Sequence, residues 1–223
     1  MYHIAGFFGK RFVSVKKILY ENTSYTFREM KKKFYLVPFL LAIYFCSFCQ
    51  TGFRDKLSTA AMELTKVLVR YDPAYYRISY PGGDIPSGKG VCTDVIIRAY
   101  RSIGTDLQKE IHEDMIRNFE KYPHYWGLSK TDPNIDHRRV PNMMMFFTRK
   151  GLAKAITDDP KDYLPGDLVC WDLGGGITHI GIVVHLKSDD GKRNLIVHNI
   201  GGGQVLADCL FKYPIIGHFY YEK

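Results

Sequence analysis

Three residues of this 223-residue chain have the types and the order of a thiol-based catalytic site: Cys92, His179 and His198. Cys92 follows the glycine-bearing loop Ser87-Gly88-Lys89-Gly90 and begins a predicted helix. Unpaired N–H groups and the helix dipole favour an anion there, so we expect a stabilised thiolate. The backbone N–H of Cys92 is also well placed to help bind a developing oxyanion.

The two histidines lie at the ends of consecutive predicted strands. His179 precedes Ile180-Gly181-Ile182-Val183-Val184, and His198 follows Leu195-Ile196-Val197. Adjacent antiparallel strands would bring the two imidazoles together, and one can then orient the other as a triad requires. Each residue alone has a simpler reading: a cysteine at a helix start is more often a small buried hydrophobe, and a strand-end histidine a surface or capping residue. The ordered combination favours a catalytic set.

The other cysteines have less to suggest chemistry. Cys170 lies within a predicted strand beside Trp171, and we interpret it as a core residue. Cys209 lies near a late turn, and we interpret it as structural. With Cys92 they make an odd number after residue 50, which leaves at least one free thiol. No pair has metal-ligand spacing, so we expect no metal site.

The elements that must position these residues follow from hydrophobic periodicity and turn signals. Helices are predicted over 57–70, 92–103, 106–121 and 141–150, and strands over 167–172, 179–185, 194–199, 204–207 and 216–221. Helices followed by a strand meander are typical of an α+β fold rather than of alternating βαβ units.

The N-terminal segment has the layout of a secretory signal. Three lysines at 31–33 precede an almost uninterrupted apolar stretch over 34–48. That stretch is short for a membrane-spanning helix, although a retained anchor is the alternative interpretation. Met30 directly precedes the lysines and is a candidate for the true start. Cys46 or Cys49 offers a position for lipid attachment after cleavage.

The positive charge belongs mostly to this segment. The chain has a net charge of +8, but residues 1–49 hold eight Lys/Arg against two Asp/Glu, and residues 50–223 hold 23 against 21. The second part therefore has no strong electrostatic footprint for a polyanion, and nucleic-acid binding is not expected. We predict an N-terminal extension with a signal peptide or membrane anchor over 1–49, followed by a single domain over 50–223.

Taken in order, the motifs resemble those of the NlpC-type cell-wall cysteine peptidases, a branch of the papain-like superfamily. The matching residues are Tyr80-Pro81-Gly82-Gly83, Cys92, Gly166-Asp167-Leu168-Val169, His179-Ile180-Gly181-Ile182 and Val197-His198. The resemblance covers roughly residues 57–221. More narrowly, Gly90-Val91-Cys92-Thr93-Asp94 and the stretch from Asp132 to Asn142 are similar to the DUF1287 family of exported bacterial proteins.

The resemblance implies a papain-like NlpC-type core, with N-terminal helices packed on a C-terminal antiparallel sheet. It implies Cys92 as nucleophile, His179 as general base and acid, and His198 as the third polar member. The expected activity is that of an exported cysteine hydrolase, a thiol protease or amidase that cleaves peptidoglycan through a thioester without metal or organic cofactor. Alternatives are acyl transfer at the same site and a non-catalytic cell-wall-binding module. The expected location is the periplasm or cell envelope, as a soluble protein or a lipoprotein.

The expected partners are the stem peptides of peptidoglycan, with the membrane involved only through the N-terminal segment. The wider family has Asp-Cys-Ser where this chain has Val91-Cys92-Thr93, and we expect Asp94 to supply the missing carboxylate. The cluster Asp136-His137-Arg138-Arg139 has the chemistry to bind substrate carboxylates, with a solvated loop or internal salt bridge as the alternative. Tyr80 is expected to line the pocket or donate to the oxyanion, with a packed loop aromatic as the alternative.

Overall fold

A computed structural model describes residues 52–223, which begin with a helix over residues 52–64. The predicted signal, Met30, Cys46 and Cys49 lie outside this part of the chain. The first helix begins and ends about five residues earlier than its pattern predicted. It ends where the Thr65 hydroxyl donates to the Met62 carbonyl at 2.7 Å, a local bond of the kind that competes with helix continuation. Within residues 52–223, no helix has the length and apolar character needed to cross a bilayer.

The three following helices form close to where the periodicity predicted them: α2 (Cys92–Ser102), α3 (Leu107–Asn118) and α4 (Val140–Arg149). Their ends have local causes. The side chain of Asp106 accepts from the Gln108 N–H and caps α3, and Pro141 occupies the first turn of α4, where a missing N–H costs nothing. Short 3-10 turns at Phe119–Lys121, Tyr125–Gly127, Asp136–Arg138 and Pro160–Asp162 complete the helical part.

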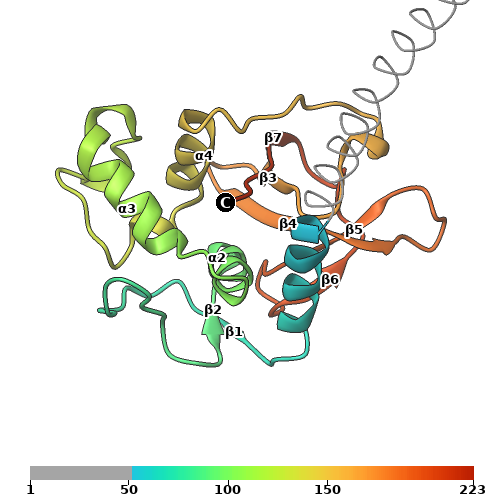
Figure 1. The fold of residues 1–223 in the computed structure, drawn as a ribbon, viewed down its shortest axis with the longest axis horizontal. Helices are drawn as coiled ribbons and strands as arrows, with labels where there is room; N and C mark the ends of the chain where they lie inside the picture. Colours follow the sequence, from blue (N-terminus) through green and yellow to red (C-terminus); the bar gives the residue numbers. More distant parts are fainter. Residues whose placement is uncertain (1–51) are drawn as a thin grey trace, which may run out of the picture. The chain divides into compact units, whose positions relative to one another are not determined.

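Five antiparallel strands make the sheet that carries the histidines. They are β3 (Leu168–Asp172), β4 (Thr178–Lys187), β5 (Asn194–His198), β6 (Val205–Ala207) and β7 (Ile215–Phe219). The spatial order is β6-β5-β4-β3-β7, so the last strand leaves the meander and pairs beside β3. Figure 1 shows α2 next to this sheet, where its residues contact β4. A parallel pair of two-residue strands, β1 (Arg70–Tyr71) and β2 (Lys89–Gly90), was not predicted.

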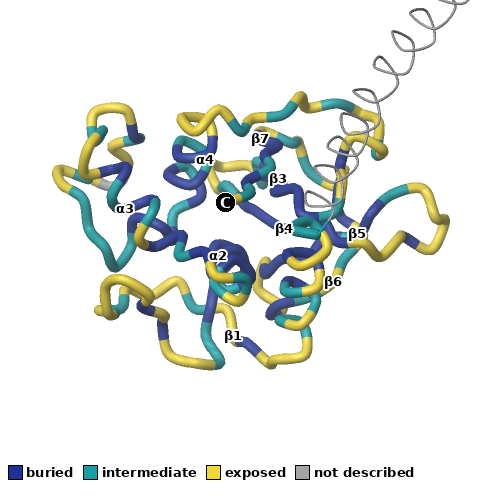
Figure 2. Tube along the Cα trace, viewed as in Figure 1, coloured by how far each residue is buried: buried dark blue, intermediate teal, exposed yellow. Residues whose placement is uncertain are grey.

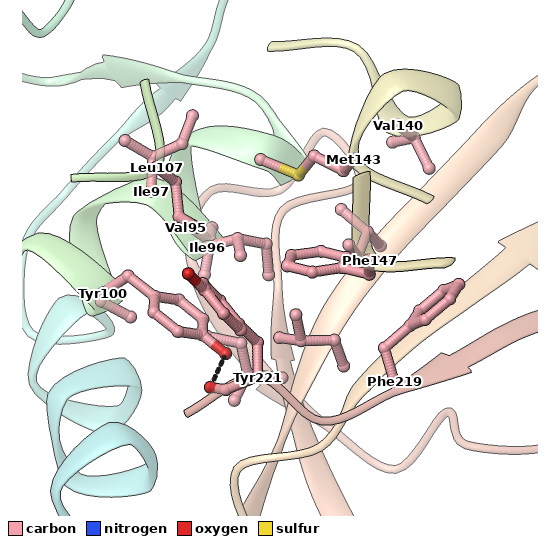
Figure 3. Packing of buried hydrophobic residues seen from close by; sticks show 14 of the residues in the cluster. Val95, Ile96, Ile97, Tyr100, Leu107, Val140, Met143, Phe147, Phe219 and Tyr221 are labelled. Atoms are coloured by element: carbon pink, nitrogen blue, oxygen red, sulfur yellow. Dashed lines mark hydrogen bonds between the residues drawn. The ribbon is translucent and has the colours of Figure 1, made fainter. Parts of the chain in front are cut away.

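The sheet separates two hydrophobic clusters, because successive strand residues point to opposite faces. The larger cluster includes the apolar faces of α2, α3 and α4 together with Cys170 and Ile180. Figure 2 shows the buried interior of α2, and Figure 3 shows the packing around it, including the hydrogen bond from the Tyr100 hydroxyl to the Tyr221 carbonyl. The smaller cluster, on the other face, includes Trp171 and Cys209. The α+β class and the core position of Cys170 are thus confirmed.

A buried ion cluster joins the helix over residues 52–64 to the sheet. Asp167, fully buried, accepts from Arg54 at 2.7 Å, from Lys154 at 2.6 Å and from His218 at 2.8 Å. It also accepts from the Leu164 N–H at 3.0 Å and so ties the preceding turn to the strand. Burial alone would raise the pKa of this carboxyl, but the bonds from His218, Lys154 and Arg54 together hold the pKa below its ordinary value.

We predict that Asp167→Ala lowers the free energy of unfolding by about 3 kcal/mol, because it leaves buried cations without their partner. The folded pKa lies below the unfolded one. This contribution is therefore complete above the unfolded pKa of about 4 and is lost as pH falls through the lower folded value. Urea unfolding followed by circular dichroism at pH 7 and pH 3 measures both effects.

Asp208→Ala provides the matched control, because Asp208 pairs with Arg193 at the surface and its removal should cost less than about 1 kcal/mol. Equal losses for the two variants at pH 7 would contradict the role assigned to Asp167.

Candidate active site

The start of α2 is fixed by a buried carboxylate. Asp94 accepts from the Val91 N–H at 2.7 Å, which satisfies one of the unpaired donors at the helix start. Its two oxygens also accept from Arg138 Nε at 2.9 Å and Nη2 at 3.1 Å, a bidentate pair in which both side chains are almost fully buried. Cys92, the first helical residue, is therefore held rigidly between the glycine-bearing loop and the 3-10 turn that carries Arg138.

Cys92 lies in a pocket of about 180 Å³, although only 7% of the residue is exposed. The lining residues come from the β1 region, the start of α2, the 3-10 turn, α4 and β4: Tyr71, Pro73, Val91, Cys92, Ile135, Arg138, Arg139, Val140, Pro141 and Thr178. A space of this size is smaller than most small-molecule sites and suits one small group rather than a large ligand.

Burial decides the protonation of the thiol. It raises the pKa of Cys92 to about 11, and the charge of Asp94 acts in the same direction. The backbone N–H groups of Ile180, Thr93 and Cys92 itself oppose this rise by stabilising the thiolate. The expected anion-favouring effect of the helix start is thus present, but desolvation exceeds it. The prediction of a stabilised thiolate is wrong for the unliganded protein.

The predicted pairing of the two histidines is confirmed. His179 Nε2 lies 2.8 Å from His198 Nδ1, and both residues are only 4% exposed. The imidazole of His179 also packs against the indole of Trp171, with ring centroids 5.7 Å apart. Burial lowers the pKa of His179 to about 3 and also lowers that of His198. Both rings are therefore neutral at pH 7.

Gly181 explains how the two rings approach each other. An added Cβ on Gly181 would lie 2.6 Å from Ile196 Cγ2 and 3.2 Å from His198 Cβ. Real side chains do not tolerate such contacts, so only glycine lets β5 bring His198 over β4 toward His179. The glycine of the His179-Ile180-Gly181-Ile182 motif is therefore a geometric requirement of the pair.

The thiol and the imidazole pair approach the same stretch of β4 without a direct bond. Cys92 packs with Ile180 in the cluster on the helical face. His179 is paired in register with Trp171, whose side chain belongs to the opposite face. Within residues 52–223, the side chain of His179 makes its hydrogen bond through Nε2 to His198. No hydrogen bond joins His179 to the sulfur of Cys92. Proton transfer between Cys92 and His179 stays a prediction.

Several predicted substrate-binding residues lie too deep to contact a ligand in this conformation. Both oxygens of Asp94 are taken by Val91 and Arg138, so the structure does not support Asp94 as a replacement for the family carboxylate. Asp136 is fully buried and pairs with His112 at 2.8 Å. His137 is 1% exposed, and burial lowers its pKa to about 3.

Two members of that predicted set do reach the pocket, and a third does not. Arg138 and Arg139 both line it, although the charge of Arg138 is compensated by Asp94. Tyr80 lies outside the pocket lining and packs edge-on against His112, with ring centroids 5.0 Å apart. Tyr80 is also 41% exposed, so it is only partly packed, and its role at the site stays a prediction.

Tyr71 is a pocket residue that the sequence did not reveal. It lines the space beside Cys92, and its pKa is raised by burial first and then by the charges of Cys92 and Asp94. Its signal was hidden because Tyr71 belongs to the two-residue strand β1, which carries no periodicity. Thr178, the first residue of β4, also lines the pocket and was not predicted. Nothing about a threonine at that place in the sequence indicates that it faces the pocket. No group of three or more metal-ligating side chains occurs between residues 52 and 223.

Comparison with known proteins confirms the narrower of the two resemblances, that to the DUF1287 family. The model of the family described as "Domain of unknown function (DUF1287)" matches residues 58–221. The chain belongs to the DUF1287 family. It is also 49% identical over 151 residues to "Uncharacterized protein YijF" of Escherichia coli (strain K12), an alignment that covers 68% of this chain and 73% of that protein. No solved structure matches the chain.

We predict that Cys92 reacts slowly with iodoacetamide in the native protein. Because its pKa of about 11 lies two units above the ordinary thiol value, its thiolate fraction at pH 7.5 is lowered about a hundredfold. The rate should keep rising tenfold per pH unit beyond pH 9. Mass spectrometry of the alkylated peptide, over pH 7 to 10, measures it.

The urea-unfolded chain is the matched reference for the intrinsic reactivity of this thiol. A native rate at pH 7.5 equal to that of the unfolded chain, or a plateau below pH 9, would contradict the burial argument.

Proposed function

We propose that this protein is an exported cysteine hydrolase that cleaves a peptide or amide bond of bacterial cell-wall peptidoglycan. One observation carries the proposal. A thiol at the start of an 11-residue helix lines a pocket and meets three backbone N–H groups, beside the strand whose second residue is the paired His179. The motif resemblance to NlpC-type peptidases, with their papain-like core, supports the same chemistry.

The reaction proceeds in two balanced steps. The sulfur of Cys92 bonds to the scissile carbonyl carbon while its proton passes to His179, and the C–N bond then breaks as His179 protonates the leaving amine. Water, deprotonated by His179, attacks the thioester, and the proton returns to the Cys92 thiolate as the acid leaves. Backbone N–H groups around Cys92 are the donors for the oxyanion. His198 orients His179 throughout.

Ionisation of this site requires both groups at once. A thiol with a pKa of about 11 and an imidazole with a pKa of about 3 stay neutral separately at pH 7. A thiolate and an imidazolium brought together replace part of the lost hydration by mutual attraction, so the two charges form more easily together than separately. We infer that substrate binding, which orders the rings and the sulfur, brings about this coupled transfer.

The substrate group nearest the thiol is expected to be anionic. Arg138 and Arg139 line the pocket, and among residues 52–223 no carboxylate does. We assign carboxylate recognition to Arg139, which lines the pocket and is half-buried. Wall stem peptides carry several carboxylates, and a guanidinium binds them bidentately.

A non-catalytic wall-binding module is the second candidate, and the raised pKa of Cys92 is the observation that favours it. Such a module would bind wall fragments without releasing products. Acyl transfer is a variant of the first proposal in which an amine resolves the thioester, and product analysis with added amines separates it from hydrolysis.

We predict that Cys92→Ala abolishes the release of peptide fragments from purified peptidoglycan, because no other thiol of residues 52–223 lines the pocket. His179→Gln should reduce the release by at least about a hundredfold, the usual contribution of a general base. Mass spectrometry of the soluble products measures both effects.

Cys170→Ala is the matched control, since Cys170 is buried in the sheet and does not line the pocket. Equal release by wild type and Cys92→Ala would refute the hydrolase, whereas retained wall binding without any release would favour the binding module.

We predict that Arg139→Gln raises the KM for stem peptides with a free carboxylate about tenfold, the order expected for one charge-assisted hydrogen-bonded pair. Amidated peptides should show no such change. Steady-state kinetics on the two peptide series measure the difference. Arg193→Gln, which removes a surface arginine paired with Asp208, is the control. Equal KM values for Arg139→Gln and wild type on carboxylate substrates would contradict the assignment.

A further inference from the structure

A third polar contact extends the histidine pair away from the pocket. The Sγ atom of Cys209 lies 3.8 Å from His198 Nε2, on the opposite side of that ring from His179. Contacts to sulfur are longer than those to oxygen because the atom is larger. His179, His198 and Cys209 therefore form a continuous hydrogen-bonded row, and all three residues are less than a tenth exposed.

The two imidazoles are neutral, and this limits where the protons of the row can lie. Both imidazoles are neutral at pH 7, since burial lowers the pKa of each ring and the charge of Lys212 further lowers that of His198. A neutral imidazole has one N–H donor and one acceptor nitrogen. The row can therefore run in only two directions, and the direction at one end determines the tautomer at the other.

In the first direction, the sulfur of Cys209 accepts from His198 Nε2–H. His198 Nδ1 then accepts from His179 Nε2–H, which leaves a lone pair on His179 Nδ1. In the second direction, the thiol of Cys209 donates, and His179 Nδ1 carries a proton. Only the first direction gives His179 a nitrogen that can take a proton. It also places both rings in the Nε2–H tautomer, which a free histidine side chain prefers.

We infer that Cys209 is a positioning residue for His179, acting as the acceptor that fixes the tautomers of both histidines. The effect of this role on catalysis rests on the proposed function, whereas the geometry of the row does not. Cys209 packs with Trp171 and Leu210 in the cluster on the face of the sheet that carries His179. Cys209 is only 7% exposed, and this limits the access of a water molecule that could replace its sulfur as the acceptor.

The test reads the tautomers directly. Protein labelled with ¹⁵N-histidine is studied by long-range ¹H–¹⁵N correlation at pH 7, with His179→Gln and His198→Gln used for assignment. We expect both rings of the wild type in the Nε2–H form. Cys209→Ser, which keeps an acceptor, should retain it, and Cys209→Ala should shift His198 and His179 toward the Nδ1–H form. Cys170→Ala, the same change at a buried cysteine without a histidine contact, should leave the tautomers unchanged.

Kinetics on wall fragments provide the second readout. We expect Cys209→Ala to lower kcat about tenfold at an unchanged KM, and Cys209→Ser to restore most of it. A wild-type His198 protonated at Nδ1, or tautomers and kcat unaffected in a folded Cys209→Ala, would overturn the role of Cys209. An inactive wild type would instead refute the proposed hydrolase, while the tautomers would still report on Cys209.

Discussion

Removal from water is the constraint on which this site depends. The thiol of Cys92 and the imidazoles of His179 and His198 are each less than a tenth exposed, and burial is the largest influence on the pKa of all three. Each group is therefore held neutral. A neutral, desolvated site does no chemistry until two groups exchange a proton, and that exchange is favourable only if the resulting charges lie close together. The low reactivity predicted for Cys92 and the strength of an ion pair, once formed, would both follow from removal from water.

The surroundings of the site serve to fix positions rather than to add charge. Asp94 forms an ion pair with Arg138 and accepts from the Val91 N–H. The start of α2 is therefore held in place without a net charge. Because Gly181 has no side chain, β4 and β5 can place His179 Nε2 within 2.8 Å of His198 Nδ1. Within the stretch that resembles a binding cluster in the sequence, Asp136 and His137 are thus buried, and Arg138 is paired with Asp94.

The two faces of the sheet carry different residues of the candidate site. The helical face presents the sulfur of Cys92 to the backbone of β4 at Ile180. The opposite face holds the imidazoles against Trp171 and Cys209. Strand β4 carries His179 and packs against Cys92 at Ile180, and its first residue, Thr178, lines the pocket.

The sequence by itself determined the elements with strong periodicity and the pairing of the histidines. Helices α2 to α4 and all five strands of the sheet lie close to their predicted positions, and His179 meets His198, because local hydrophobic pattern and strand adjacency decide both. Only the tertiary structure decided burial, and with it the raised pKa of Cys92, the internal roles of Asp94 and Asp136, and the presence of Tyr71 in the pocket. These depend on which distant segments exclude water from a residue, and a linear pattern carries no such information.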